Sequence, residues 1–179
     1  MSATKMAFDA FRAQFGPARL PPAEAIANDD ELRPMSSAEG LCVWSDGNHA
    51  CNCQTEPSDY PQATKDFLDE RRLWVVAQDE VLHAKERCAF GLSLETGVIK
   101  HTNITGGKAA FCGGEMIVVN DNTIILNGRS RRYGPRSSTE MTAVAKSFTG
   151  SGYSVWAMGY DDEAGVALPF QGTRPTWVA

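Results

Sequence analysis

The stretch EMIVVNDNTIILN, residues 115–127, decides the fold class of this chain. It contains two runs rich in β-branched residues, 115–120 and 122–127, on either side of Asp121. Such side chains fit a pleated, half-buried surface, and a short polar connection between two such runs is typical of a tight turn. The stretch therefore predicts a β-hairpin, and the rest of the chain has to supply partners for its strands.

A second hairpin is predicted upstream of the first. The apolar run 73–77 has the composition of a buried strand, and Gln78-Asp79 separates it from a second run at 80–86. Further short strands are expected at 41–46, 89–94, 98–102 and 153–158.

Helical periodicity appears in three segments. Residues 5–15 place three phenylalanines at i, i+3 and i+7, which is one apolar helical face. Residues 60–72 predict a second helix, and residues 138–149 predict a third. The third begins with Ser137 and Glu140 in the spacing of a capping box. Its core face is formed by Met141, Val144, Ala145 and Phe148.

Strands outnumber helices, and 179 residues are enough for one domain with a substantial core. We therefore expect a single α+β domain over 1–179, with a mostly antiparallel sheet, an N-terminal helix and two further helices. Residues 1–40 are expected to be a helix followed by an extended segment that either is mobile or wraps the domain. Residues 41–179 would form the α+β core.

The bulk composition limits the function classes. A net charge of −5 argues against a broad nucleic-acid-binding surface. No apolar run is long enough to span a membrane, and the N-terminus lacks a signal-peptide pattern. We therefore expect a cytoplasmic protein, or one exported by a route that needs no signal peptide.

The segment KHTNITGGKAAFCGGEM, residues 100–116, is the first candidate site. His101 could bind a ligand or exchange a proton near neutral pH. Gly106 and Gly107 allow a backbone to approach a ligand closely, and Glu115 could face His101 across the loop. The alternative is a histidine at the end of a strand, a wide turn with two glycine pairs, and a solvated glutamate.

The arginine-rich loop NGRSRRYGPR, residues 127–136, is the second candidate site. Guanidinium groups bind phosphate and carboxylate bidentately, and the loop leads into the positive end of a helix. Ser130 adds a hydroxyl, and Tyr133 offers a ring for stacking. A nucleotide or another anionic small molecule is the expected partner; a solvated basic loop is the alternative. The arginines are Arg129, Arg131, Arg132 and Arg136.

The cysteines give a third, weaker candidate. Cys42, His49, Cys51 and Cys53 match none of the common zinc-ligand spacings, so no metal is expected. Cys42 could instead be a nucleophile with His101 as its base, which would make the protein a Cys-His hydrolase or deamidase.

Residues 100–152 follow an ordered pattern: His101, Gly106-Gly107, Gly113-Gly114-Glu115, the hairpin, then Ser130-Arg131-Arg132-Tyr133 and Pro135. This order resembles a domain found in C-terminal parts of bacterial effectors and polymorphic toxins, and in plant calmodulin-binding IQ-motif proteins. Those proteins have Gly-His where this chain has Arg131-Arg132. The resemblance implies that His101, Glu115, Ser130 and Tyr133 belong to one constellation.

Three functions follow as hypotheses. The first is an effector-type transferase that uses NAD and resembles the His-Tyr-Glu class of ADP-ribosyltransferases. By that resemblance His101 would hold the nicotinamide ribose, Tyr133 would stack on nicotinamide, and Glu115 or Glu140 would polarise the ribose. Only Glu140 keeps the usual order of the three residues. The residues expected to bind the cofactor are Gly106, Gly107, Arg129, Ser130 and Arg132.

The second hypothesis is a non-catalytic module, such as an immunity protein or adaptor, that binds an anionic ligand or an acidic protein partner. The third is the Cys-His hydrolase. The transferase hypothesis makes a geometric prediction: the hairpin should return the arginine-rich loop beside residues 100–116, so that His101 and Tyr133 line one cleft.

Overall fold

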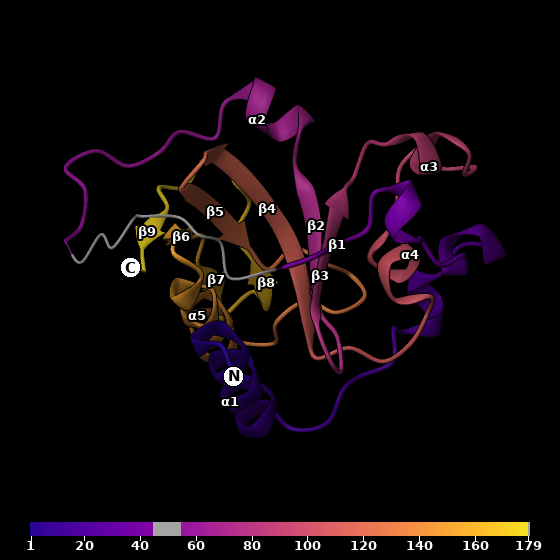
Figure 1. The fold of residues 1–179 in the computed structure, drawn as a ribbon, viewed down its shortest axis with the longest axis horizontal. Helices are drawn as coiled ribbons and strands as arrows, with labels where there is room; N and C mark the ends of the chain where they lie inside the picture. Colours follow the sequence, from indigo (N-terminus) through magenta and orange to yellow (C-terminus); the bar gives the residue numbers. More distant parts are fainter. Residues whose placement is uncertain (45–54, 179) are drawn as a thin grey trace.

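A seven-stranded sheet forms the centre of the structure, a computed structural model that describes residues 1–44 and 55–178 (Figure 1). Its strand order is β1-β3-β2-β4-β5-β6-β9. The strands are β1 (Cys42–Val43), β2 (Arg72–Val76), β3 (Val81–Lys85), β4 (Cys112–Asn120), β5 (Thr123–Asn127), β6 (Ser154–Ala157) and β9 (Thr176–Trp177). A separate small hairpin pairs β7 (Tyr160–Asp161) with β8 (Val166–Ala167).

Most of the helices are short. They are α1 (Ala3–Phe15), α2 (Lys65–Asp69), α3 (Ala89–Leu92), α4 (His101–Thr105) and α5 (Ser138–Ser147). Of these, only α1 and α5 extend over ten residues or more. Single 3-10 turns are η1 (Ala23–Ala25), η2 (Asp29–Leu32), η3 (Ser37–Glu39) and η4 (Thr149–Ser151). None of the helices in the described part of the chain is long and apolar enough to cross a membrane. The α+β class and the largely antiparallel sheet predicted from the sequence are confirmed.

The deciding hairpin forms as predicted. Strands β4 and β5 pair antiparallel, with Met116 opposite Leu126 and Ile117 opposite Ile125. Because side chains alternate across a strand, these two pairs face opposite sides of the sheet. All four side chains are buried, so this part of the sheet is covered on both faces.

One face of the sheet carries α1 and α5. Phe8 and Phe11 of α1 and Phe148 at the end of α5 pack with Trp74 of β2 in a single apolar cluster. Figure 1 shows the two helices lying against each other. Because α5 carries the chain from β5 back across the sheet, β6 pairs parallel to β5, which the local sequence pattern of 153–158 does not reveal.

The opposite face is covered differently. Leu73 and Val75 of β2 pack there with Ile99, Ile104 and Tyr133. Helix α4 and the N-terminal segment cover this side (Figure 1). This is the face on which the candidate site lies.

The strands predicted at 89–94 and 98–102 are wrong, because these residues form α3 and the start of α4. The side-chain oxygen of Asn103 accepts the Lys100 N–H at 2.7 Å and so satisfies a donor at the beginning of α4. Gly106, with φ of +64°, ends the helix after five residues. The helix predicted over 60–72 is also shorter than expected, since only Lys65–Asp69 is helical.

The N-terminal segment 17–40 lies against the domain. Arg19 and Ala110 exchange two backbone hydrogen bonds of 2.8 and 2.9 Å. Further along, the Met35 N–H donates to the main-chain oxygen of Asn103, and the buried Asn103 amide donates to two carbonyl oxygens of this segment. These contacts hold residues 17–40 against the rest of the described chain.

Candidate functional site

A cavity of about 770 Å³ opens on the face of the sheet that carries Leu73. It is bounded by β2, β4, the start of α4, the loop 128–136 and the segment 165–171. Its charged lining within the described residues consists of two carboxylates, Glu86 and Glu115, and six cations, Arg19, Arg71, Lys100, Arg129, Arg131 and Arg132.

Strand pairing brings the separate segments of this cavity together. Glu115 of β4 lies opposite Leu73 of β2 on one side and opposite Asn127 of β5 on the other. The loop 128–136 follows β5 directly, so it returns beside the strand that carries Glu115. Five predicted site residues line the cavity: His101, Glu115, Arg129, Ser130 and Arg132.

His101 is 5% exposed and is held by a single strong contact, from Nε2 to the main-chain oxygen of Gly114 at 2.8 Å. Because a carbonyl oxygen only accepts, Nε2 carries the hydrogen and Nδ1 keeps its lone pair. Nδ1 has no hydrogen-bond partner within residues 1–44 and 55–178. Burial, with smaller contributions from Arg132 and Lys100, lowers the pKa of His101 to about 4. The residue is therefore a neutral acceptor at pH 7.

Gly113 and Gly114 make this close approach feasible. A Cβ at position 114 would lie 2.0 Å from the main-chain oxygen of Asn127, which no side chain tolerates. A Cβ at position 113 would lie 3.3 Å from both the His101 ring and the Cβ of Tyr133. The second glycine pair of the segment 100–116 thus lets the histidine pack directly against β4.

The first glycine pair has a different role from the one predicted. Both residues adopt positive φ, +64° at Gly106 and +77° at Gly107. Their nearest neighbours are the side chains of Pro34 and Leu32, and neither glycine lines the cavity. The backbone of Gly106 and Gly107 therefore approaches the N-terminal segment closely, and it does not approach the cavity.

Glu115 lies on the same face as His101, which the sequence could not decide. One of its oxygens accepts from the Asn127 side-chain amide at 2.9 Å. The other is 3.8 Å from Nε of Arg71, which itself donates to Glu86 at 2.6 Å. Burial alone would lower the pKa of Arg71, but the hydrogen bond to Glu86 and the two carboxylate charges raise it overall.

Sequence reasoning missed Arg71 and Glu86. Both lie at the open end of the second predicted hairpin, where the Glu86 N–H donates to the main-chain oxygen of Arg71. Two opposite charges that flank a predicted hairpin are cross-strand neighbours, so the pairing itself was available as a signal. That Arg71 lies beside Glu115 depends on the β2-β4 register, which no local pattern reveals.

Tyr133 is fully buried and does not line the cavity. Its hydroxyl donates to the main-chain oxygen of Lys108 at 2.7 Å and contacts the Thr105 hydroxyl at 2.9 Å. Its own carbonyl accepts the Gly113 N–H, so the residue ties the loop to β4. Of these two residues, only His101 lines the cavity, so the prediction that both line one cleft is wrong. The Tyr133 ring is not placed to stack on a ligand there.

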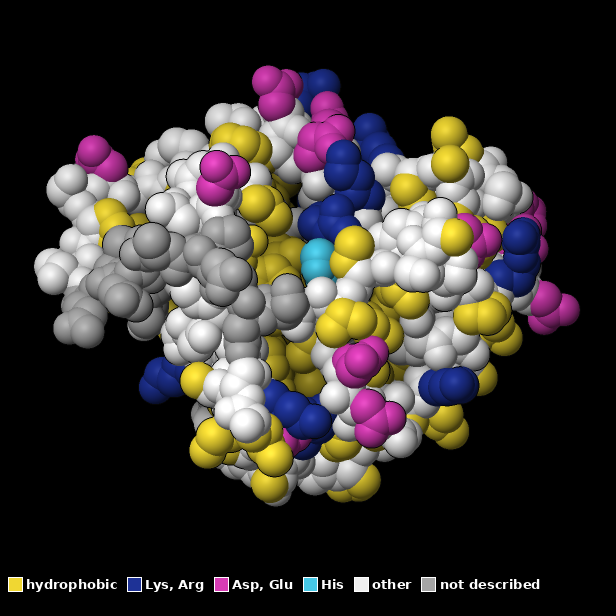
Figure 2. Space-filling model, in the orientation of Figure 1, with side chains coloured by type: hydrophobic (Ala, Val, Ile, Leu, Met, Phe, Trp, Pro, Cys, Tyr) yellow, Lys and Arg dark blue, Asp and Glu magenta, His cyan; other side chains and the backbone are white. Residues whose placement is uncertain are grey.

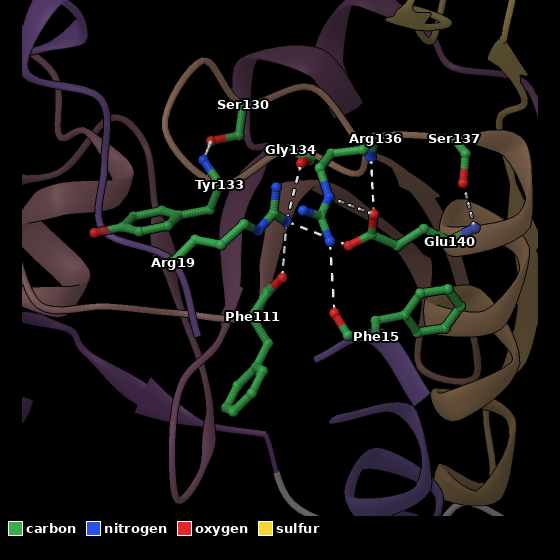
Figure 3. Close-up of polar contacts among 9 residues, drawn as sticks. All are labelled: Phe15, Arg19, Phe111, Ser130, Tyr133, Gly134, Arg136, Ser137 and Glu140. Atoms are coloured by element: carbon green, nitrogen blue, oxygen red, sulfur yellow. Dashed lines mark hydrogen bonds and ion pairs between the residues drawn. The ribbon is translucent and has the colours of Figure 1, made fainter. Parts of the chain in front are cut away.

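Glu140 does not line the cavity either. Figure 3 shows its carboxylate between Arg19 and Arg136. Its carboxylate is almost fully buried and accepts from the guanidinium of Arg19 at 3.2 Å and the N–H of Arg136 at 3.0 Å. Ser137 accepts the Glu140 N–H, as expected for a cap, but the carboxylate does not return to Ser137. The residue joins the N-terminal segment to the start of α5.

The cations of the arginine-rich loop fall into two groups. Arg132 is tied to the N-terminal segment by Glu31 at 2.6 Å and by the carbonyl of Ala25 at 2.7 Å. Burial would raise the pKa of Glu31, but the Ala27 N–H and Arg132 together lower it. In contrast, the guanidinium groups of Arg129 and Arg131 are exposed and have no partner in the described part of the chain.

Ser130 shapes the loop. Its hydroxyl accepts the N–H groups of Arg132 and Tyr133 at 3.2 and 3.1 Å. These bonds fix the turn that places Arg129 and Arg131 at the cavity and Tyr133 beneath it. Ser130 itself also lines the cavity.

Cys42 does not meet His101. It lies opposite His83, on the face of the sheet away from Leu73 and Glu115. Arg72 donates to Nδ1 of His83 at 2.8 Å and to the sulfur of Cys42 at 3.5 Å, so it occupies the lone pair that a general base needs. Figure 2 shows a histidine beside basic side chains on the face turned toward the viewer.

The residues of the metal hypothesis lie mostly outside the described ranges. His49, Cys51 and Cys53 fall between 45 and 54. Within residues 1–44 and 55–178, no three metal-ligating side chains come together.

Comparison of the chain with protein-family models, with curated proteins and with solved structures finds no match.

Proposed function

We propose that this chain binds a small anionic molecule of the nucleotide class in the cavity beside Glu115, and that Glu115 and His101 are the groups that act on it. The observation that carries the proposal is the pair of exposed guanidinium groups, Arg129 and Arg131, which face the cavity without carboxylate partners among the described residues. Lys100 adds a third cation that forms no ion pair there.

The charge balance supports an anion. Six cations and two carboxylates line the cavity, while the whole chain carries a net charge of −5. Arg19 and Arg132 are neutralised by Glu140 and Glu31, which do not line the cavity. The remaining cations exceed the carboxylates, and planar guanidinium groups match phosphate oxygens bidentately. A volume of about 770 Å³ also suits a ligand of nucleotide size.

NAD is the concrete ligand that we propose, in a transferase of the effector type. Its diphosphate would contact Arg129 and Arg131, and the carboxylate nearest to the ribose would be Glu115. His101 would accept a hydrogen bond at Nδ1, because it is neutral at pH 7. The resemblance of residues 100–152 to effector and toxin domains supports the effector type, whereas the NAD chemistry rests on the residue types of His101 and Glu115. Tyr133 and Glu140 have no part in it, since both are buried outside the cavity.

A second candidate is a non-catalytic module that binds an anion or an acidic protein partner. The burial of Tyr133 favours it, because the cavity then lacks the stacking ring that the transferase hypothesis required. The cation-rich lining is sufficient for binding without chemistry. A Cys42 hydrolase is less compatible with the structure, since Arg72 occupies the histidine nearest to Cys42.

Turnover of NAD separates the two candidates. The wild-type chain and Glu115→Gln are incubated with NAD and with a cell extract as a source of acceptors, and released nicotinamide is quantified by mass spectrometry. The transferase form predicts release by the wild type and a fall of at least about a hundredfold in Glu115→Gln. Binding of NAD without release would favour the non-catalytic module.

A further inference from the structure

We infer that the ligand is a phosphorylated polyol, and that Glu86, held by Arg71, binds its hydroxyl groups together with Glu115. The inference rests on the proposed anion-binding function and adds the second half of the ligand. It follows from the two walls of the cavity. We call Arg71, Glu86 and Glu115 the sheet wall, and Arg129 and Arg131 the loop wall.

The sheet wall presents hydrogen-bond acceptors that are not used within the protein. Oε2 of Glu86 accepts from Arg71, and Oε2 of Glu115 accepts from Asn127. The second oxygen of each carboxylate has no hydrogen bond from any described residue, and Oε1 of Glu115 has only the 3.8 Å contact with Arg71. Both side chains line the cavity and remain 15% and 17% exposed. Carboxylate oxygens that are mostly buried need hydrogen-bond donors, and ligand hydroxyl groups supply them.

Arg71 lies between the two carboxylates of the sheet wall. Its Nε is 2.6 Å from Oε2 of Glu86 and 3.8 Å from Oε1 of Glu115. An ionised carboxylate only accepts hydrogen bonds. The sheet wall also has one more negative than positive charge, so it repels a phosphate, whereas the loop wall attracts one.

These opposite preferences define the ligand class. A bare polyphosphate would satisfy the loop wall but would leave the oxygens of Glu86 and Glu115 without donors. A neutral sugar would satisfy the sheet wall but would leave Arg129 and Arg131 without an anion. A sugar phosphate or a nucleoside phosphate satisfies both walls in one molecule.

Three probes test the inference by titration calorimetry: ribose 5-phosphate, 2-deoxyribose 5-phosphate and inorganic phosphate. For the wild type we expect the affinity to fall in that order, with ribose 5-phosphate at least about tenfold tighter than inorganic phosphate. Glu86→Gln should remove most of this preference, while its affinity for inorganic phosphate stays the same or rises because a like charge is lost.

The matched control is Glu80→Gln, an exposed glutamate at the far end of the same hairpin, which should retain the wild-type order. Glu86→Asp keeps the charge, so it tests the hydroxyl preference if the glutamine variant unfolds. Equal affinity of the wild type for all three probes, or an equal loss for all three in Glu86→Gln, would overturn the inference and leave the anion site in place. If none of the three probes binds, the inference fails; if NAD does not bind either, the proposed function fails with it.

Discussion

The imidazole of His101 donates from Nε2 to the main-chain oxygen of Gly114 at 2.8 Å. This contact fixes the start of α4 against β4, one residue before Glu115. It also fixes the tautomer, because the carbonyl oxygen only accepts and Nδ1 keeps the lone pair. The histidine and the second glycine pair are therefore one structural unit.

Stability should fall as the pH falls from 6.5 to 4. The unfolded histidine takes up a proton below pH 6.5, whereas burial keeps His101 neutral in the folded protein until about pH 4. The unfolded state therefore binds more protons in this window, and His101 contributes a loss of up to about 3 kcal/mol. Urea unfolding at pH 7, 6 and 5 measures the slope. His101→Gln should flatten it, and an unchanged slope would contradict this assignment.

His83 provides a second share of the same effect. Burial and the nearby Arg72 lower its pKa to about 4 as well. The sign is the same as for His101, because the folded pKa lies below the unfolded one. His83→Gln should therefore remove part of the slope that remains in His101→Gln. If the double variant keeps the wild-type slope, titrating carboxylates are the cause.

Gly114→Ala should destabilise the fold. The added Cβ would lie 2.0 Å from the carbonyl oxygen of Asn127, so β4 and β5 must separate locally. We expect a loss of at least about 1–3 kcal/mol in the free energy of unfolding. Gly159→Ala is the matched control, since the nearest atom there is the mobile end of Leu168 at 3.3 Å. Equal effects of the two variants would show that the packing around Gly114 is not as tight as described.

Glu31→Gln should loosen the N-terminal segment. Glu31 and Arg132 are 4% and 9% exposed, and removal of one charge leaves the other buried without compensation. Such a change typically costs about 3–5 kcal/mol. Hydrogen exchange should report faster exchange in residues 17–40. Lys65→Ala, which removes an exposed pair with Asp69, should cost less than about 1 kcal/mol. Similar small losses in both variants would argue against a role for Glu31 in holding the segment.

Cys42→Ser should leave ligand affinity unchanged. Cys42 and its neighbour Arg72 lie on the face of the sheet opposite Leu73 and Glu115. Titration of ADP against wild type and Cys42→Ser measures the effect, and alkylation of the wild type provides an independent comparison. A tenfold loss of affinity in Cys42→Ser would mean that the two faces are coupled.

Local patterns predicted the parts of the fold that depend on local chemistry. β-Branched runs predicted the 115–127 hairpin, and the return of the loop 128–136 beside His101 followed from that hairpin. The face on which Glu115 lies could not be predicted, because a shift of one residue in register reverses it. The short helix at 101–105 was also missed, since its start depends on the Asn103 side chain.

The fate of each predicted side chain depended on tertiary packing. Tyr133 and Arg129 belong to one short loop, yet Tyr133 is fully buried while Arg129 stays exposed. Arg132 appeared free in the sequence but is bound by Glu31, about a hundred residues away along the chain. Residue types indicated an anion site, but only the folded neighbours show which cations remain available.

The most direct measurement is the thermal stabilisation of the protein by ADP, in the wild type and in Arg129→Ala/Arg131→Ala. A ligand that binds only the folded state raises the Tm in a saturable manner. We predict such a rise for the wild type and for the exposed-lysine control Lys146→Ala, and an affinity at least about tenfold weaker in the double variant. No rise with millimolar ADP in the wild type, or an undiminished rise in the double variant, would contradict an anion site at this cavity.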